Sequence, residues 1–476
     1  MIILVPEIAL TSQLIDEFAH HFENVILTHS RQTEAERHLT WQAVLAATAP
    51  QVIVGPRSAL FLPVRSLGLI VIDEFHEPSF KQEQSPRYSA LRLASAMTAF
   101  AGAKAVFGSA TPPINEYYLA TKLQRPVIKL SNQARKDTVK PKLHLVDMTK
   151  RTQFKQHRFI SDKLIASIQG ALDQNKQSLL FHNRRGSAST TLCEHCGWIA
   201  TCTNCLIPMT LHADMHTLRC HVCDKHERVP THCPVCHETQ IIFKGIGTKL
   251  IEAEIKRLFP NKKVARFDAD TVQDDTIQHR YKELYDGTID IIIGTQVIAK
   301  GLDLPHLRAV GVIQADAGLA LPDYISSERT FQLLAQVVGR VGRSHHPTEV
   351  VIQSYQPTHP AVQDGINQDF DHFYHAVLTS RKTAHFPPFT FLLKLTCTYK
   401  TEPAAIKNTR DFTLYLKKTF PTVRVLGPTP AFYEQAGGGY RWQLIVKSPH
   451  RRTLVSITKQ LPNPHWQFDL DPATLL

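Results

Sequence analysis

The chain has 476 residues, 43% of them hydrophobic, which predicts about three or four domains with real cores and excludes a disordered chain. Its first residues, MIILVPEIAL, lack the basic region and cleavage site of a signal peptide, and no run of residues is apolar enough to span a membrane, so we expect a cytoplasmic protein. The 54 basic and 42 acidic residues give a net charge of +12, which favours a polyanionic partner but fits a merely basic soluble protein equally well.

Apolar runs and helical patterns alternate along residues 1–135, which predicts a parallel, doubly wound sheet. Helical segments at Thr11–His21 and Glu34–Leu45 lie between short strands that end in polar or glycine-bearing residues. Loops at the carboxyl ends of such strands are where ligands bind. The predicted strands are Ile2–Val5, Val25–Leu27, Val52–Val54, Leu69–Ile72 and Ala105–Phe107.

A second α/β pattern follows and is interrupted by a cysteine-rich block. One sheet with a metal-bound insertion explains this pattern better than two half-domains. We therefore assign 136–192 to a linker and the start of a second lobe, 193–240 to the cysteine-rich module, 241–381 to the rest of the lobe and 382–476 to a small α+β domain. A loose stretch at about 131–160, rich in Lys, Arg and Gln, is expected to join the lobes.

The elements expected in this second half follow from the same patterns. In the lobe they are a helix at Gly247–Leu258 and strands at Ser178–Phe181, Lys263–Phe267, Ile289–Ile293, Ala309–Ile313 and Val350–Ser354. In the C-terminal domain they are strands at Leu392–Thr398, Val423–Leu426 and Trp442–Lys447.

Eight of the nine cysteines lie between positions 193 and 236, with the spacing C-x2-C-x5-C-x2-C-x14-C-x2-C-x9-C-x2-C. In a cytoplasmic chain such clustering indicates metal rather than disulfides. Two C-x2-C pairs complete one tetrahedral four-cysteine zinc site, so four pairs predict two structural Zn²⁺ ions. We expect nested pairing, because sequential pairing would squeeze the first site around only five intervening residues. The inner set is then Cys202, Cys205, Cys220 and Cys223, and the outer set is Cys193, Cys196, Cys233 and Cys236.

Two alternatives for this module stay open. A histidine could replace a ligand, but with eight thiolates present we expect the nearby histidines to face solvent, and an iron–sulfur cluster is the main alternative to zinc. The spacing does not say whether the module binds nucleic acid, binds protein or braces the fold. The histidines concerned are His195, His212, His221, His232 and His237.

Two acids, Asp73 and Glu74, follow the apolar run Leu69–Ile72 and should lie at the end of a buried strand. In a nucleotide-hydrolysing fold the first acid holds Mg²⁺ through water and the second polarises the attacking water. An Asp-Glu pair alone is weak evidence, because surface carboxylates are common. Ser109 and Thr111, in Gly-Ser-Ala-Thr-Pro after the next strand, strengthen it, because small hydroxyl residues there can sense the nucleotide.

The second lobe carries matching motifs in the same order. Gly-Thr-Gln follows Ile289–Ile293 and continues to Lys-Gly-Leu-Asp, which ends at Asp303. Further on, Arg340 and Arg343 share a helix face and could reach a triphosphate from the second lobe, a role that suits the permanent charge and bidentate fork of arginine. An exposed basic helix would explain these arginines in isolation, but the ordered set of motifs makes chance improbable.

With these motifs the chain resembles the primosomal protein N′ (PriA) family, the replication-restart DNA helicases of superfamily 2. The resemblance spans essentially the whole chain and includes LVPEIALTSQ, VIDEFHEPSFKQEQSPRY, GSATP, FHNRRG, the eight cysteines, IGTQVIAKGLDLP, SERTFQLLAQVVGRVGR and GGGYRWQLIVK. It implies two RecA-like helicase lobes, ATP and Mg²⁺, 3′→5′ unwinding at stalled forks, and recruitment of helicase-loader and single-strand-binding proteins to a monomer.

The resemblance also implies roles for particular residues. Nucleotide contacts fall on Gln336, Gly301, Asp303, Ser109 and Thr111. The segment Phe80–Tyr88 corresponds to a loop that couples DNA contact to ATP hydrolysis, and its aromatic and cationic groups independently suit single strands. The expected DNA contacts are Phe80, Lys81, Arg87, Tyr88, Thr295, Gln296, Arg184 and Arg185.

The chain departs from this family in one large respect, because the sequence contains no G-x4-G-K-[ST] phosphate-binding loop. Smaller departures are Phe75, where a second glutamate is usual, and Leu302, where histidine is common. We therefore expect an N-terminally truncated helicase, from a split gene or a wrong start, that hydrolyses ATP negligibly by itself. The alternative is a non-catalytic zinc-ribbon scaffold that binds DNA or protein through a degenerate helicase body.

Overall fold

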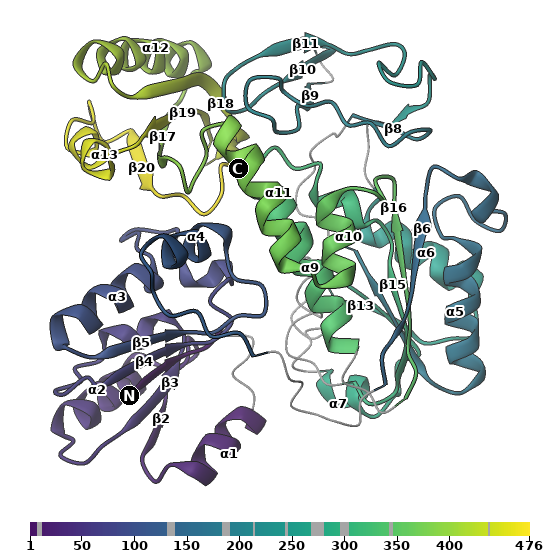
Figure 1. The fold of residues 1–476 in the computed structure, drawn as a ribbon, viewed down its shortest axis with the longest axis horizontal. Helices are drawn as coiled ribbons and strands as arrows, with labels where there is room; N and C mark the ends of the chain where they lie inside the picture. The colour runs from purple at the N-terminus through teal and green to yellow at the C-terminus, as the bar shows by residue number, and fades with distance from the viewer. Residues whose placement is uncertain are drawn as a thin grey trace. The chain divides into compact units, whose positions relative to one another are not determined.

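The computed structural model describes the chain except residues 7–11, 131–138, 183–190, 213–214, 243–245, 268–279, 296–303, 342–345 and 437. The chain divides into two compact units, Met1–Arg125 and Pro126–Leu476. Figure 1 shows the ribbon with the element labels used below. Among the described residues, no helix combines the length and the apolar character needed to cross a bilayer.

Unit 1 is a five-stranded parallel sheet with the strand order β2-β3-β1-β4-β5. The strands are β1 (Ile2–Leu4), β2 (Val25–Leu27), β3 (Val52–Gly55), β4 (Leu69–Ile72) and β5 (Lys104–Phe107). Both faces of β1 and β3 are buried, as expected for continuous apolar runs in the centre of a parallel sheet. The edge strand β5 differs, because all four of its residues are exposed.

Helices connect the strands of unit 1 and begin where the sequence supplies caps. Thr33 and Glu36 form a reciprocal capping box at the start of α2, with the Thr33 amide donating to the Glu36 carboxylate at 2.7 Å. Gly102 ends α3 in the left-handed region at φ 65°. The helices are α1 (Ser12–His21), α2 (Glu34–Ala46), η2 (Arg57–Phe61), η3 (Pro78–Phe80), α3 (Ala90–Ala101) and α4 (Ile114–Lys122).

Unit 2 is built on a six-stranded parallel sheet with the order β13-β14-β7-β15-β16-β6. Its strands are β6 (Lys142–Asp147), β7 (Gln177–Phe181), β13 (Val264–Phe267), β14 (Ile291–Gly294), β15 (Leu307–Val312) and β16 (Glu349–Ser354). Because β7 precedes the cysteine block and pairs with β14 and β15 that follow it, the expected single sheet with an insertion is confirmed.

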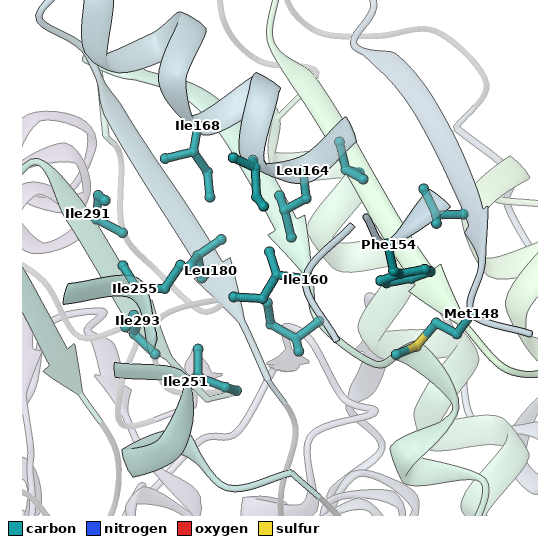
Figure 2. Close-up of a cluster of buried hydrophobic side chains, with 14 of the residues drawn as sticks. Met148, Phe154, Ile160, Leu164, Ile168, Leu180, Ile251, Ile255, Ile291 and Ile293 are labelled. Carbon is teal, nitrogen blue, oxygen red and sulfur yellow. The ribbon is translucent and has the colours of Figure 1, made fainter. Parts of the chain in front are cut away.

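Aliphatic side chains that precede and follow the insertion in the sequence pack together in one hydrophobic core against this sheet (Figure 2). Leu164 and Ile168 come from α5, Leu180 from β7, and Ile251 and Ile255 from α6. The helices of the unit are α5 (Asp162–Asp173), α6 (Thr248–Leu258), α7 (Tyr281–Tyr285), α9 (Ser326–Val341), α10 (Pro360–Asn367) and α11 (Phe370–Thr383), with short turns η4 (Arg151–Gln153) and η6 (Ala315–Gly318).

The interpretation of about 131–160 as a linker is wrong for part of that stretch, because β6 lies within it and pairs with β16 from Lys142↔Glu349 to Asp147↔Ser354. The strand was missed because it is an edge strand on which only Val146 is buried, so it lacks the continuous apolar run that marks a central strand.

The cysteine module carries two small sheets, and a separate sheet forms the C-terminal domain. The module contains β8 (Leu192–Cys193) paired with β12 (Ile241–Ile242), and a hairpin sheet of β9 (Thr210–His212), β10 (Thr217–Arg219) and β11 (His226–Arg228). The C-terminal sheet is antiparallel, with the order β18-β19-β17-β20. Its elements are β17 (Phe391–Tyr399), α12 (Glu402–Thr419), β18 (Arg424–Ala436), β19 (Gly439–Ser448), α13 (Arg451–Thr458) and β20 (Trp466–Leu470).

Candidate motor and metal sites

The two predicted hydrolytic acids of unit 1 follow β4 directly, at the carboxyl end of the sheet. The Asp73 amide donates to Leu4 O at 2.9 Å, and Asp73 Oδ1 accepts the Glu74 amide at 2.9 Å. Glu74 has φ 48°, a conformation that costs a non-glycine residue on the order of 1 kcal/mol and that turns the chain sharply after the strand. Asp73 is exposed, so its carboxylate is accessible to a hydrated cation.

His76 connects these acids to the hydroxyl loop after β5. Its Nδ1 lies 2.7 Å from Ser109 Oγ and 3.4 Å from a Glu74 carboxylate oxygen, and its Nε2 lies 3.7 Å from Glu77. Ser109 Oγ also accepts the Thr111 amide at 3.0 Å. The structure therefore connects Glu74 to Ser109 and Thr111 through His76, a residue of the Asp-Glu-Phe-His motif that we did not single out.

The predicted DNA-coupling loop is anchored at both ends. Its start, Phe80, is only 1% exposed and belongs to the core of unit 1, so the structure does not place it where a base could stack, and our prediction for this residue is wrong. The Gln82 amide donates to Tyr88 O at 2.8 Å, which closes the loop. Arg87, just before Tyr88, is exposed and its Nε donates to Glu83 O, and Lys81 is half-buried.

Two residues missed in the sequence complete the surface around Tyr88. Phe61, which is 58% exposed, meets the Tyr88 ring edge-to-face at 5.2 Å. Arg57 donates to Ser79 O and to the Gln82 side chain, which fixes it beside the loop. Tyr88 itself is half-buried, and this burial raises the pKa of its hydroxyl. Both residues lie in η2, far from the loop in sequence, so no spacing pattern could have joined them to it.

The predicted residues of the second lobe are described only in part. Thr295 follows β14 and its amide donates to Phe267 O at 3.4 Å, and Gln336 is half-buried on α9. Arg340 lies on the same helix, but its side chain is outside the described residues. The remaining predicted sites also lie outside them, namely Arg184, Arg185, Gln296, Gly301, Asp303 and Arg343.

The eight clustered cysteines form two groups of four, and within each group all the Sγ atoms lie within 4.8 Å of one another. The groups are Cys193, Cys196, Cys233 and Cys236, and Cys202, Cys205, Cys220 and Cys223. These are the outer and inner clusters that nested pairing predicts. Three cross-pair Sγ–Sγ distances are 3.6 Å, close to the edge of about 3.8 Å in a tetrahedron with zinc–sulfur bonds of about 2.3 Å.

All four C-x2-C pairs have the same backbone geometry. The residue after each second cysteine has a positive φ, and its amide donates to the carbonyl of the first cysteine. These residues are Gly197 (φ 75°), Leu206 (φ 54°), Asp224 (φ 65°) and His237 (φ 64°). Such turns aim two thiols at one point, so the donor set and its geometry fit a four-thiolate Zn²⁺ site in each cluster.

The outer cluster is attached to the second lobe. Leu192 and Ile199 beside it belong to the core of the lobe, together with Tyr355 after β16. Gln356 Nε2 donates to Gly197 O at 2.8 Å. A Cβ at Gly197 would lie 2.0 Å from Tyr355 O, so this position requires glycine for space as well as for its φ.

The inner cluster is attached to the C-terminal domain instead. Cys202, Cys205 and Cys220 are buried in one hydrophobic cluster with Phe386 and Ile445. Two hydrogen bonds cross the contact: Gln443 Nε2 donates to His221 O at 2.8 Å, and His221 Nδ1 lies 3.0 Å from Pro430 O.

Our expectation that the nearby histidines face solvent is wrong for His221. It is 3% exposed, and its ring packs edge-to-face on Phe432. Burial lowers the pKa of His221 to about 4. The lone ninth cysteine, Cys397, is buried in the separate core of the C-terminal domain.

Family models match most of the chain. DEAD/DEAH box helicase matches residues 1–119, the helicase conserved C-terminal domain matches 224–345, the PriA DNA helicase Cys-rich region domain matches 202–228, and the primosomal protein N C-terminal domain matches 382–473. Together with the parallel sheets of the two units and the paired cysteine clusters, these matches identify a chain with two helicase domains, a PriA-type cysteine-rich region and a primosomal C-terminal domain.

Similar curated proteins identify the family to which the chain belongs. Replication restart protein PriA of Treponema pallidum is 34% identical over all of this chain and 73% of its own length. The Bacillus subtilis relative of the same name is 34% identical over 97% of this chain, and the Haemophilus influenzae relative is 33% identical over all of it. The chain therefore belongs to the PriA family of replication restart proteins. It spans 57% of the Bacillus relative and 66% of the Haemophilus relative.

Solved structures are more distant. Saccharomyces cerevisiae Dbp5 bound to RNA and ADP BeF3 is 14% identical, with a TM-score of 0.41, over 80% of this chain and 81% of that one.

Proposed function

We propose that this chain is the motor body of an ATP-driven 3′→5′ DNA helicase that restarts replication at stalled forks. The observation that carries the proposal is the connected set Glu74, His76 and Ser109 at the carboxyl end of the unit 1 sheet, in a chain whose relatives are replication restart proteins. In this cluster, Asp73 would hold Mg²⁺ through water and Glu74 would polarise the attacking water. The His76–Ser109 contact would report nucleotide state to the next strand.

DNA contact is proposed for the surface formed by Phe61, Tyr88, Arg57 and Arg87, which combines the exposed ring of Phe61 and the half-buried ring of Tyr88 with two cationic groups. Aromatic stacking and phosphate attraction together suit single strands without sequence preference. We propose the cytoplasm as the compartment, and forked DNA, helicase-loader proteins and single-strand-binding protein as the partners of a monomeric chain. The net charge of +12 supports the DNA partner.

We propose one structural Zn²⁺ in each cysteine cluster, two per chain. Bound zinc would cross-link segments that are distant in sequence, and the chain's own residues would supply four thiolates to each ion. Elemental analysis should find two zincs per chain in the wild-type protein and in Cys397→Ser. One zinc per chain would contradict the nested pairing of the clusters.

ATP binding also requires a phosphate-binding loop, and the 476 residues contain no G-x4-G-K-[ST]. The exposed strand β5 supports a proposal for where such a loop would act. A parallel strand added beside β5 would end next to Ser109 and Glu74, because Gly108 donates to Ile72 O and Phe75 donates to Gly108 O across this end of the sheet. The loop that follows the added strand would then meet the two acids.

The absence of that loop from the sequence favours one other candidate, a non-catalytic zinc-ribbon scaffold that binds DNA or protein. The DNA upstream of the codon for Met1 discriminates between the two. An in-frame G-x4-G-K-[ST] there, and DNA-dependent ATP hydrolysis by the longer product that Glu74→Gln abolishes, would support the helicase. A longer or unchanged product that binds DNA with no effect of ATP would support the scaffold.

A further inference from the structure

The segment 471–476, which we call the strap, follows β20 of the C-terminal sheet and packs against the second lobe. Pro472 and Leu475 are buried, and Leu475, at 1% exposed, lies in one hydrophobic cluster with Phe386 and Leu392. A short segment that follows the last strand of a domain is usually poorly ordered unless contacts tie it down. The contacts of the strap therefore identify what it joins.

One side of the strap binds the start of α9. Asp323 lies just before this helix, and its Oδ2 accepts the Thr474 hydroxyl at 2.5 Å and the Leu475 amide at 3.1 Å. Arg329, in the first turn of the helix, donates through Nη2 to Ala473 O at 3.1 Å. Three successive residues of the strap thus bind the beginning of one helix.

Asp323 depends on these contacts because it is a buried carboxylate. It is 3% exposed, and within the described part of the chain no cation pairs with it. Apart from the strap, its carboxylate accepts only a long 3.5 Å bond from the Ile325 amide among the described residues. Burial of a carboxylate without donors is costly, so loss of the strap should open this turn to water. The turn includes the Ser326 amide, which donates to Asp323 O at 3.2 Å, so the start of α9 should open with it.

The other side of the strap is bound to β17 of the C-terminal sheet. Lys394 on this strand donates through Nζ to the main-chain oxygens of Leu475 and Leu476, at 3.1 and 2.6 Å. Where the strap begins, the Asp471 amide donates to Leu392 O at 2.9 Å. A displacement of β17 would therefore be transmitted by the strap to α9.

We propose that the strap is the element through which the C-terminal domain positions α9, the helix that carries Gln336 and Arg340. Asp323 and Thr474 are then positioning residues, which hold the start of this helix and touch no substrate themselves. A ligand that shifts β17 would loosen or tighten the first turns of α9. The inference rests on the proposed motor function, in which α9 contacts ATP, but the strap can be tested without nucleotide.

The test measures hydrogen–deuterium exchange of the α9 amides in variants of the 476-residue chain, with no nucleotide present. Thr474→Val removes the hydroxyl that donates to Asp323 and keeps the shape of the side chain, whereas Thr474→Ser keeps the hydroxyl. Lys394→Met releases the strap from β17 and leaves its bonds to α9 in place. The matched control is Leu416→Ala, which destabilises the C-terminal domain in its separate core, where Leu416 on α12 is fully buried.

We expect the first two turns of α9 to exchange about tenfold faster in Thr474→Val than in wild type, because a hydrogen bond to a buried charge is lost. Lys394→Met should increase exchange in the same peptides, whereas Thr474→Ser and Leu416→Ala should exchange there like wild type. Unchanged exchange in Thr474→Val or in Lys394→Met would overturn the proposal. An equal increase in Leu416→Ala would also overturn it, since a general loss of stability would then explain the effect.

Circular dichroism and thermal unfolding establish that each variant is folded before exchange is measured. If Thr474→Val does not fold, Lys394→Met decides: faster exchange of α9 supports the strap, and unchanged exchange overturns it. Failure of the proposed function is recognised separately. ATP turnover near background in the longer product would overturn the motor and leave the exchange result as it stands.

Discussion

Strands β5 and β13 are both four-residue edge strands of parallel sheets, yet their surroundings differ. A helix packs on each strand, α6 on β13 and α3 on β5, but in β13 Ala265 and Phe267 are buried. In β5 every residue is exposed, and Phe100 on the preceding helix is 98% exposed. Parallel sheets are normally covered on both faces, so the described part of unit 1 leaves an edge that a further strand would complete.

Unit 2 differs further in how its parts are joined. Its sheet contacts the outer cysteine cluster, and the inner cluster contacts the C-terminal sheet. A buried ion pair at 2.5 Å between Arg381 on α11 and Glu328 joins α11 to α9, the helix that carries Gln336. Buried contacts therefore join the second lobe to the cysteine clusters and the clusters to the C-terminal sheet, whereas in unit 1 the predicted hydrolytic acids lie at the end of a sheet whose described edge strand is exposed.

The largest effect on stability is expected where the outer cysteine cluster packs against the second lobe. Gly197→Ala should destabilise unit 2 by about 3 kcal/mol or more, because its Cβ would lie 2.0 Å from Tyr355 O in addition to the cost of a positive φ. Gly102→Ala is the control, since it has a similar φ of 65° but no atom within 4 Å of the added Cβ. For Gly102→Ala, denaturant unfolding should show a loss of only about 1 kcal/mol in the free energy of unfolding. Equal losses in the two variants would mean that the contact with Tyr355 does not matter.

The second largest effect on stability is expected at the ion pair between Glu328 on α9 and Arg381 on α11. Arg381→Met should cost about 3 kcal/mol in the free energy of unfolding, because it leaves the carboxylate of Glu328 buried without its cation. The double variant with Glu328→Gln should recover part of the loss. If the double variant is less stable than either single one, the pair does not act as a unit.

Asp316 gives a smaller, pH-dependent effect. It is fully buried in η6, which follows β15, where its Oδ1 accepts from Ser354 Oγ at 2.7 Å and from the Tyr355 amide at 2.8 Å, and its Oδ2 accepts from Gln314 Nε2 at 3.2 Å. Burial raises its pKa above the usual 3.8, so ionisation of Asp316 lowers stability as the pH rises through the folded-state pKa.

Asn at this position keeps an acceptor for Ser354 and Tyr355 without ionising, and it gives up the weaker 3.2 Å bond from Gln314 at every pH. The stability of Asp316→Asn relative to wild type should therefore increase as the pH is raised from about 4 toward neutrality. Thermal unfolding across that range measures it. A relative stability that falls with rising pH would show that the folded-state pKa of Asp316 is depressed.

The smallest effect on stability is expected at the open edge of unit 1. Val106→Lys should change the free energy of unfolding by no more than about 0.5 kcal/mol, because Val106 is 52% exposed. Denaturant unfolding measures this change, and sedimentation velocity should find wild type and Val106→Lys equally monomeric, since lysine protects sheet edges from pairing. A loss of about 2 kcal/mol would mean that Val106 is packed and that the edge is not open.

The sequence predicted much of the fold, because continuous apolar runs identify central parallel strands. Val25–Leu27 and Leu69–Ile72 match their strands residue for residue. The long β18 was predicted only as Val423–Leu426, since register shifts beside its prolines interrupt the alternation that marks a strand. The edge strands β6 and β20 were missed or mistaken for linker, because few of their side chains are buried.

At the sites, the sequence predicted the features that depend on local spacing, but it did not predict those that depend on packing between distant segments. The C-x2-C spacing predicted the two cysteine groups, because each turn is set by a few adjacent residues. Burial of Phe80, and the contacts of Tyr88 with Phe61 and of His221 with Phe432, depend on segments far apart in sequence. No pattern within a short window encodes such contacts.

The decisive measurement is ATP turnover by the purified 476-residue chain, with and without forked DNA. We expect hydrolysis near background under both conditions, because Asp73 and Glu74 are in place while the sequence holds no G-x4-G-K-[ST] to bind the phosphates. DNA-stimulated turnover well above background that disappears in Glu74→Gln would contradict it, since this chain would then bind and hydrolyse ATP without that loop.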